Sequence, residues 1–164
     1  MPDLLTHFLV AFLFVKLIKI ERYKSLIYLG TILPDILTRC PVFAMDVILN
    51  IREFNWFFMP LHTPLGILLT CLFVTYFFDE KSRKFVFTNL MAGAFLHLFL
   101  DVLQIHWGTA YYLFYPFSWV KFEIGLFWPH QSIYFIPVLS LVAAVIISIL
   151  VVENGEFGVR NRNV

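Results

Sequence analysis

Charged residues are scarce in this sequence: Asp, Glu, Lys and Arg make up 14% of the 164 residues, and the formal net charge is only +1. No basic stripe or basic tail stands out, which argues against nucleic acid as a partner. The two cysteines, Cys40 and Cys71, have a spacing that fits neither a zinc finger nor a disulfide framework. These absences exclude proteins that rely on a basic surface or on a cysteine scaffold.

Hydrophobic residues, in contrast, make up 60% of the chain and aromatic residues 19%, with a mean hydropathy of +0.82. A soluble domain of this size does not normally tolerate so apolar a composition. Lipid tails and neighbouring helices can solvate the 20 Phe side chains, whereas a water-facing surface cannot. We therefore expect an all-α, polytopic integral membrane helical bundle.

The apolar residues form stretches separated by charge, Pro or Gly, at about 4–20, 26–38, 56–78, 85–105 and 132–152. A membrane-spanning helix needs roughly 20 residues, so four of these stretches are long enough. The stretch 26–38 is too short alone, and its Pro34 lacks a backbone donor, so we expect a half-helix or one sheltered by its neighbours. The sequence thus predicts four to five hydrophobic segments in one domain, 1–152, followed by a polar tail, 153–164.

The positions of Lys and Arg predict the orientation of the chain. If the N-terminus is outside and the five stretches alternate in direction, nine of the 12 Lys and Arg residues fall on one side and three on the other. The nine are Lys16, Lys19, Arg22, Lys24, Lys81, Arg83, Lys84, Arg160 and Arg162, and the three are Arg39, Arg52 and Lys121. Because cytoplasmic loops are rich in Lys and Arg, we expect Glu21–Ser25, Asp79–Lys84 and the C-terminus in the cytoplasm. The aromatic connections 39–55 and 106–131 then lie in the outer interface.

Five ionisable residues of the apolar stretches reach the outer face on this topology: His7, Asp35, His62, His97 and Asp101. Random placement on stretches that alternate in direction would divide them between the two faces. Ionisable groups in or near hydrocarbon are costly, and they usually face a bundle interior and have partners. The sequence therefore predicts that these residues meet inside the bundle near one membrane face.

His97 and Asp101 carry the strongest local pattern. They are four residues apart on a predicted helix, so their side chains lie on one face and can bind one ion. Imidazole nitrogen with carboxylate oxygen suits zinc, and also manganese or iron. The alternative is an internal hydrogen bond between the two side chains.

The other polar residues are weaker candidates when taken singly. His7 is also explained as an interfacial histidine, Asp35 as a turn residue after Pro34, and His62 as part of a loop. They become stronger ligand candidates because they are predicted to reach the same membrane face as His97 and Asp101. Two further histidines, His106 and His130, lie in the outer connection, and at least one of them is expected to be an ordinary interfacial side chain.

The ordered set of motifs resembles the membrane-bound metal-dependent hydrolase family, the YdjM-like proteins of bacteria and archaea. The motifs cover residues 1 to about 118 and are Thr6-His7, Gly30 to Asp35, His62-Thr63, Gly93 to Asp101, and Tyr115 to Ser118. The resemblance implies an all-helical membrane relative of zinc-dependent phospholipase C and the zinc-dependent single-strand nucleases. It also implies that His7, Asp35, His62, His97 and Asp101 are the metal ligands.

The chain departs from the family pattern at three positions. Leu37 stands where the family often has a second Asp, and Phe57 and Phe58 stand where it often has a His-Arg pair. The soluble relatives use further His and Glu ligands, which are largely missing here. These departures favour one or two bound ions over a three-metal cluster.

The expected function is that of a membrane-embedded metal-dependent hydrolase of phosphoesters or lipid-like esters. A divalent ion, expected to be zinc, would be bound near the outer membrane face, with Asp35 and Asp101 as the catalytic carboxylates. The expected partners are membrane lipid and an amphipathic phosphoester substrate, and the expected location is the inner (cytoplasmic) membrane. Two alternatives remain open: a non-catalytic structural or assembly protein with a degenerate metal site, and a proton or metal-ion transporter.

Overall fold

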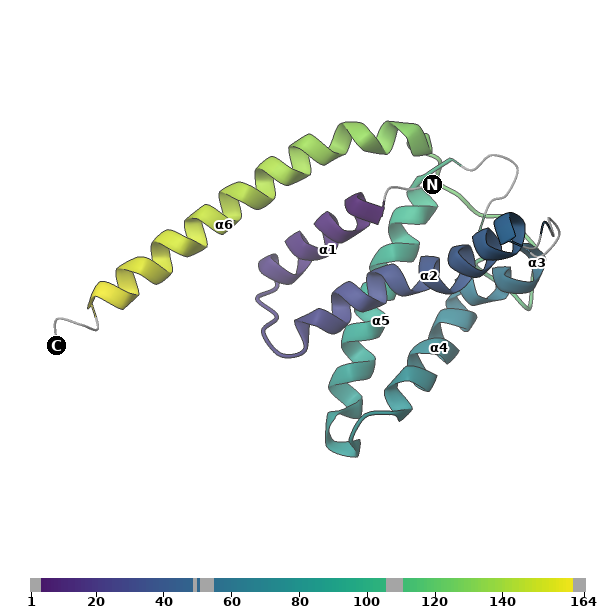
Figure 1. Ribbon diagram of the computed structural model, residues 1–164, viewed down its shortest axis with the longest axis horizontal. Coiled ribbons are helices and arrows are strands. Elements are labelled where there is room, and N and C mark those ends of the chain that lie inside the picture. Colours follow the sequence, from purple (N-terminus) through teal and green to yellow (C-terminus); the bar gives the residue numbers. More distant parts are fainter. Residues whose placement is uncertain (1–3, 49, 51–54, 106–110, 161–164) are drawn as a thin grey trace.

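The computed structural model describes residues 4–48, 50, 55–105 and 111–160, and it contains helices without extended strands in these ranges (Figure 1). The α-helices are α1 Leu4–Leu17, α2 Lys24–Ile48, α3 Asn55–Phe58, α4 Pro64–Tyr76, α5 Glu80–Leu103 and α6 Phe135–Arg160. Two 3₁₀ turns, η1 Met59–His62 and η2 Pro129–Tyr134, precede α4 and α6. The prediction of an all-α, polytopic membrane bundle is confirmed.

Three helical stretches of the described chain are long and apolar enough to cross a membrane: Lys24–Ile48, Glu80–Leu103 and His130–Val152. The helices α1 and α4, with 14 and 13 residues, are apolar but shorter. The predicted lengths were therefore wrong for three stretches. The one expected to be too short, 26–38, belongs to a 25-residue helix, whereas 4–20 and 56–78 contain shorter helices than predicted.

The helix α2 continues through Pro34 and Pro41, which explains the error in its length. Pro34 is fully buried, and the hydroxyl of Thr38 donates to its carbonyl oxygen at 2.8 Å. A proline inside a helix removes one backbone hydrogen bond, but packing against a neighbouring helix can compensate for that loss. Residues 39–48, predicted to begin an interfacial connection, are therefore helical.

The stretch 56–78 is interrupted at the Thr63-Pro64 pair. Thr63 is extended and its side-chain oxygen accepts a hydrogen bond from Gly66 N at 3.2 Å, which makes Thr63 the N-cap of α4. Pro64 occupies the first turn, where no backbone donor is needed. The turn η1 can fold back against α4 because Gly66 has no Cβ, which would collide with the carbonyl oxygen of Pro60. This interruption directs His62 into the bundle.

The helices α2 and α5 cross in close contact through two glycines. A Cβ on Gly30 would collide with the backbone of Leu90, and a Cβ on Gly93 would collide with the backbone of Ile27. Small residues at such crossings let helix backbones approach closely in membranes. This crossing brings Asp35 of α2 near His97 of α5.

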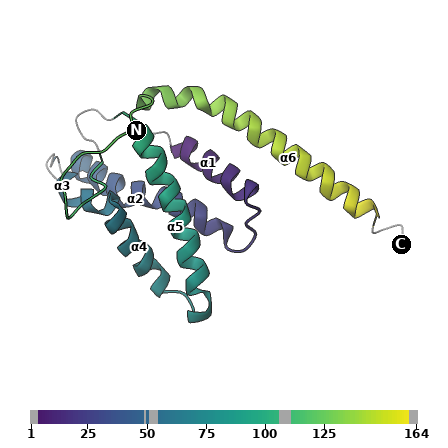
Figure 2. The ribbon, with the colours of Figure 1, turned by 180° about the vertical axis from the view of Figure 1, so that it is seen from behind.

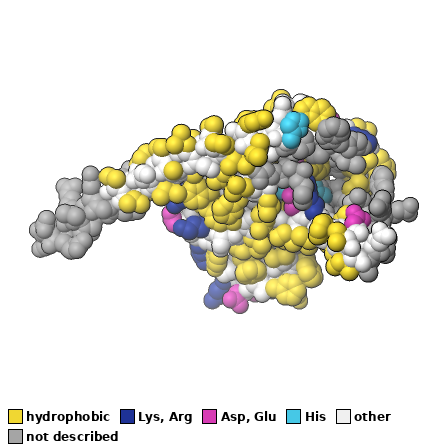
Figure 3. Space-filling model, turned by 45° about the horizontal axis from the view of Figure 1, so that its top comes forward, with side chains coloured by type: hydrophobic (Ala, Val, Ile, Leu, Met, Phe, Trp, Pro, Cys, Tyr) yellow, Lys and Arg dark blue, Asp and Glu magenta, His cyan; other side chains and the backbone are white. Residues whose placement is uncertain are grey.

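An apolar core lies among α2, α4 and α5, formed by Leu26, Ile67, Cys71, Val86, Leu90, Ala94 and Leu98. The helix α6 lies apart from that core, packs against α1, and extends away from the other helices (Figure 2). Over residues 135–152 its apolar side chains are largely exposed (Figure 3), among them Val138, Leu141 and Ile149. Such a surface suits lipid as its solvent. The backbone of α6 stays helical to Arg160, within the predicted polar tail.

Candidate metal centre

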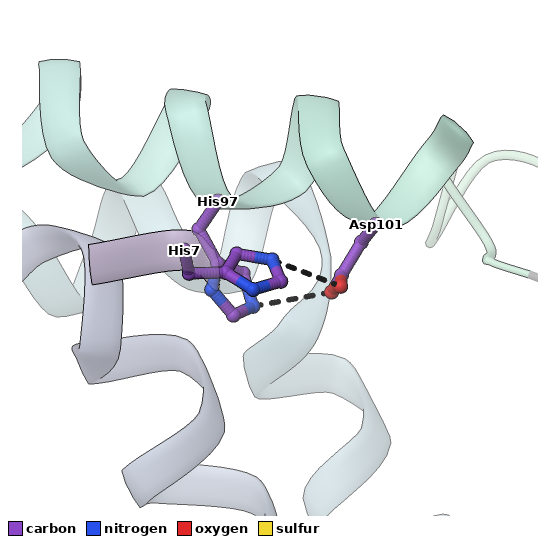
Figure 4. Close-up of side chains that lie close together, drawn as sticks. All are labelled: His7, His97 and Asp101. Atoms are coloured by element: carbon purple, nitrogen blue, oxygen red, sulfur yellow. Dashed lines mark ion pairs between the residues drawn. The ribbon is translucent and has the colours of Figure 1, made fainter. Parts of the chain in front are cut away.

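All five predicted residues come together in one buried cluster at the ends of α1, α5 and η1 and the middle of α2. Their exposed fractions lie between 0 and 9%, and they are His7, Asp35, His62, His97 and Asp101. Figure 4 shows the side chains of His7 and His97 pointing toward Asp101 from two different helices. Among the described residues, every buried His, Asp, Glu, Lys or Arg side chain belongs to this cluster.

Asp101 is at the centre of the cluster. Its Oδ2 atom lies 2.7 Å from His62 Nε2 and 3.1 Å from His97 Nε2, and its Oδ1 atom lies 3.4 Å from His7 Nε2. Oδ1 is buried and is not hydrogen-bonded within the described part of the chain. One carboxylate therefore faces three imidazole nitrogens that come from three elements.

Asp35 completes the cluster from the side of α2. Its Oδ1 atom lies 3.7 Å from His97 Nε2 and 2.6 Å from Nε of Arg39, one helical turn further along α2. The Nε2 atoms of His97 and His62 are 3.3 Å apart. His97 is thus in contact with both carboxylates.

The spacing of these atoms fits a metal ion. Two donors that bind one tetrahedral zinc ion at about 2.0–2.1 Å lie about 3.3 Å from each other. The donor pairs of the cluster are separated by 2.7 to 3.7 Å. Two groups have ligand atoms within 4.8 Å of one another: His7, His97 and Asp101, and Asp35, His62 and His97. The cluster can therefore hold a divalent ion.

Hydrogen bonds around His62 favour the tautomer that a metal requires. The Thr38 hydroxyl donates to Pro34 O, so its oxygen accepts from His62 Nδ1 at 3.3 Å. With the proton on Nδ1, the Nε2 lone pair of His62 points at Asp101 Oδ2, 2.7 Å away. Two acceptors at this distance need a proton or a cation between them, and outer hydrogen bonds of this kind orient metal-binding histidines.

Tyr111 contributes a contact that the sequence did not reveal. Its hydroxyl donates to Asp101 Oδ2 at 2.6 Å, and its ring stacks on His62 at a centroid distance of 5.3 Å. Burial, reinforced by the negative charge of Asp101, raises the pKa of the Tyr111 phenol well above its ordinary value. The phenol therefore keeps its proton and holds the Asp101 carboxylate in place.

Three neighbours of the predicted ligands were not predicted from the sequence: Thr38, Arg39 and Tyr111. The first two are three and four residues after Asp35, a helical spacing that was hidden because the stretch was predicted to end at residue 38. No local signal marks Tyr111, which reaches the cluster from a connection. His106 lies outside the described residues, and His130 is exposed and belongs to neither ligand group.

No protein-family model, curated protein or solved structure matches this chain. The resemblance to the YdjM-like family therefore stays a prediction from the motifs.

Proposed function

We propose that this protein is a membrane-embedded hydrolase of phosphoesters or lipid-like esters that uses one zinc ion bound by the buried cluster. The observation that carries the proposal is the convergence of three imidazole Nε2 atoms on Asp101, with Asp35 beside them, at ligand-like spacing. Neutral imidazole and carboxylate are the donors of catalytic zinc sites. When bound, the ion would supply a Lewis acid and a water molecule with a pKa of about 7.

We assign distinct roles to the residues of the cluster. His62, His97 and Asp101 form the core of the ligand set, because their donor atoms are all within 3.3 Å of one another. Asp35, which lies 3.7 Å from the same His97 Nε2 atom and is paired with Arg39, would orient the attacking water. His7 completes the ligand set from α1.

One ion explains the arrangement better than two. His97 belongs to both ligand groups, and the atom near both carboxylates is its Nε2. One imidazole nitrogen has a single lone pair and binds a single ion. The two groups therefore describe alternative ligand sets around one position.

We also propose the inner (cytoplasmic) membrane as the location, with the N-terminus outside. The α1–α2 and α4–α5 loops and the helix ends beside them, which together carry seven of the 12 Lys and Arg residues, lie at the ends of α1, α4 and α5 opposite the cluster (Figure 1). Figure 3 likewise shows most of the visible Lys and Arg along one edge of the molecule. Cytoplasmic loops carry such an excess of positive charge.

The burial pattern favours an enzyme over a transporter. A proton or ion relay needs ionisable groups at successive depths of the bundle. The buried His and Asp residues of the described chain are confined to one cluster, and the buried residues of the apolar core of α2, α4 and α5 include no His, Asp, Glu, Lys or Arg. A site of this kind is suited to a substrate that reaches it from one membrane face.

The metal content of the purified protein tests the ligand assignment. We expect one zinc ion per chain in detergent-purified wild-type protein, and loss of that ion in Asp101→Ala and His97→Ala, because these residues contact most of the other donors. His7→Ala should retain the ion more weakly. Asp46→Asn, which alters an exposed carboxylate of α2, is the matched control and should bind zinc normally.

Hydrolysis is measured on the same samples after monodisperse elution, because an uncompensated buried charge can unfold a small bundle. Zinc-loaded wild-type protein should cleave short-chain phospholipids, and the two zinc-free variants should not. Well-folded Asp101→Ala and His97→Ala proteins with full zinc content and wild-type activity would make the cluster structural and overturn the proposal.

A further inference from the structure

An apolar groove of about 410 Å³ runs along α4 beside the cluster. Leu65, Leu69 and Phe73 line it on α4 at a spacing of four residues, which places them on one face of the helix. The distance along the helix from Leu65 to Phe73 is about 12 Å, since each residue adds about 1.5 Å. The groove is therefore apolar and extends along α4, as an alkyl chain requires.

The walls of the groove adjoin the cluster in the sequence and in space. Leu61 precedes His62 on η1, and Leu37 precedes Thr38, whose hydroxyl contacts the His62 ring. Tyr115 closes the groove from the connection that also carries Tyr111. A chain lying in the groove would thus have its head beside the buried cluster.

A positive charge lies beside the cluster. The Arg39 guanidinium uses Nε to pair with Asp35, and its side chain keeps 27% of its surface exposed. Two carboxylates and one guanidinium leave the cluster with one net negative charge, which a divalent ion would convert to one net positive charge. In a medium of low dielectric constant, a ligand with one negative charge would then be favoured over a neutral ligand.

We propose that the groove binds an acyl chain of a phospholipid with a net negative charge, and that Arg39 contacts its phosphodiester. This inference rests on the proposed function, because it names the substrate class of the same site. The apolar groove selects an alkyl chain, and the charge of the loaded cluster selects an anionic headgroup. A neutral carboxylic ester would satisfy the groove but not the charge.

Photo-crosslinking tests the groove without requiring hydrolysis. The zinc-loaded full chain in detergent is illuminated with phosphatidylglycerol that carries a diazirine in the middle of one acyl chain. We expect labels on Leu65, Leu69 and Phe73. Phosphatidylcholine with the same chains should label these positions less, because its headgroup has no net charge.

Two matched variants show whether the label reports the groove or the lipid-facing surface. Leu69→Trp fills the groove and should reduce labelling by about tenfold, because the buried CH₂ groups of the chain lose their contacts. Leu72→Trp adds the same side chain to an exposed position of α4 outside the groove and should label as wild type does. If Leu69→Trp is poorly folded, Leu65→Trp replaces it.

Equal labelling of Leu69→Trp and wild type, or labelling of Leu72 as strong as that of Leu69, would overturn the acyl-chain site. Equal labelling by the two lipids would overturn the selection of an anionic headgroup. Ester hydrolysis is measured separately on the same samples. A labelled, zinc-loaded protein that cleaves no ester contradicts only the proposed hydrolase activity. An active protein without labels in the groove contradicts only the proposed acyl-chain site.

Discussion

At the scale of single residues, the cluster shows how uncharged neighbours set the chemistry of charged ones. The Thr38 hydroxyl donates its hydrogen bond to Pro34 O, so its oxygen is left to accept a hydrogen bond from His62 Nδ1. The Tyr111 hydroxyl in turn holds one oxygen of Asp101. These two hydrogen bonds orient His62 and Asp101 toward the centre of the cluster, although neither Thr38 nor Tyr111 is proposed as a ligand.

Thr38→Val removes the hydroxyl but keeps the shape of the side chain. We expect zinc affinity to fall by about 10- to 100-fold, the usual effect of losing a hydrogen bond that orients a ligand histidine. Competition with a chromogenic chelator measures the affinity. Thr88→Val is the control, because its hydroxyl also donates to a carbonyl one turn back but lies on an exposed face. Equal affinity in the two variants would mean that Thr38 does not orient His62.

Tyr111→Phe removes the hydrogen bond to Asp101 Oδ2 and keeps the aromatic ring. A hydrogen bond to a charged group contributes roughly 1.5–3 kcal/mol, so we expect zinc binding to weaken by about tenfold or more. Tyr112→Phe, in which the neighbouring ring keeps its contact with Trp119, should bind zinc as wild type does. The same chelator titration compares the two proteins, and unchanged binding by Tyr111→Phe would remove the proposed role of the phenol.

At the scale of helices, the crossing of α2 and α5 determines whether the cluster forms. Asp35 lies five residues beyond Gly30, and His97 lies four residues beyond Gly93, so the two glycines set the separation of these ligands. Glycine destabilises a helix relative to alanine, but it occurs where two helix backbones must approach closely.

Gly30→Ala should therefore lower both stability and zinc content. The added methyl group meets the backbone of Leu90, which cannot rotate away as a side chain can, and overpacking of this kind costs about 1–3 kcal/mol. Thermal unfolding in detergent and metal analysis measure the two effects. Leu29→Ala alters the adjacent, exposed position and should change neither. A Gly30→Ala protein with normal stability and zinc content would show that the crossing tolerates a wider separation.

At the scale of the whole molecule, the proposed orientation in the membrane follows from the positive charges in and beside two loops that lie away from the cluster. Lys16, Lys24, Lys81 and Lys84 are in or beside the α1–α2 and α4–α5 loops, and the cluster lies at the other ends of the helices. The membrane-crossing helices α2 and α5, together with α6, set the depth of the cluster relative to these charges.

A green fluorescent protein fused to the C-terminus should fluoresce, because the C-terminus is predicted to be cytoplasmic. An alkaline phosphatase fused at the same place should be inactive, since that enzyme needs the outer compartment for its disulfides. The reverse result would place the cluster on the cytoplasmic side and contradict the proposed orientation. Matched expression of the two fusions, measured by immunoblot, is the control.

The sequence by itself determined the class of protein and the residues of the cluster. Composition alone required a membrane, because so many apolar side chains cannot face water. The four-residue spacing of His97 and Asp101 placed them on one helix face, and alternating segments placed His7, Asp35 and His62 at the same level. These inferences depend only on local periodicity and on the cost of burying charge.

The tertiary structure alone decided the lengths of the helices and the outer contacts of the cluster. Pro34 has a strong local tendency to end a helix, and packing against α5 overrides it. Tyr111 meets Asp101 because a connection folds over the end of α5, and no spacing along the chain encodes that contact. Local patterns specify which residues share a face, whereas contacts between distant segments depend on how whole helices pack.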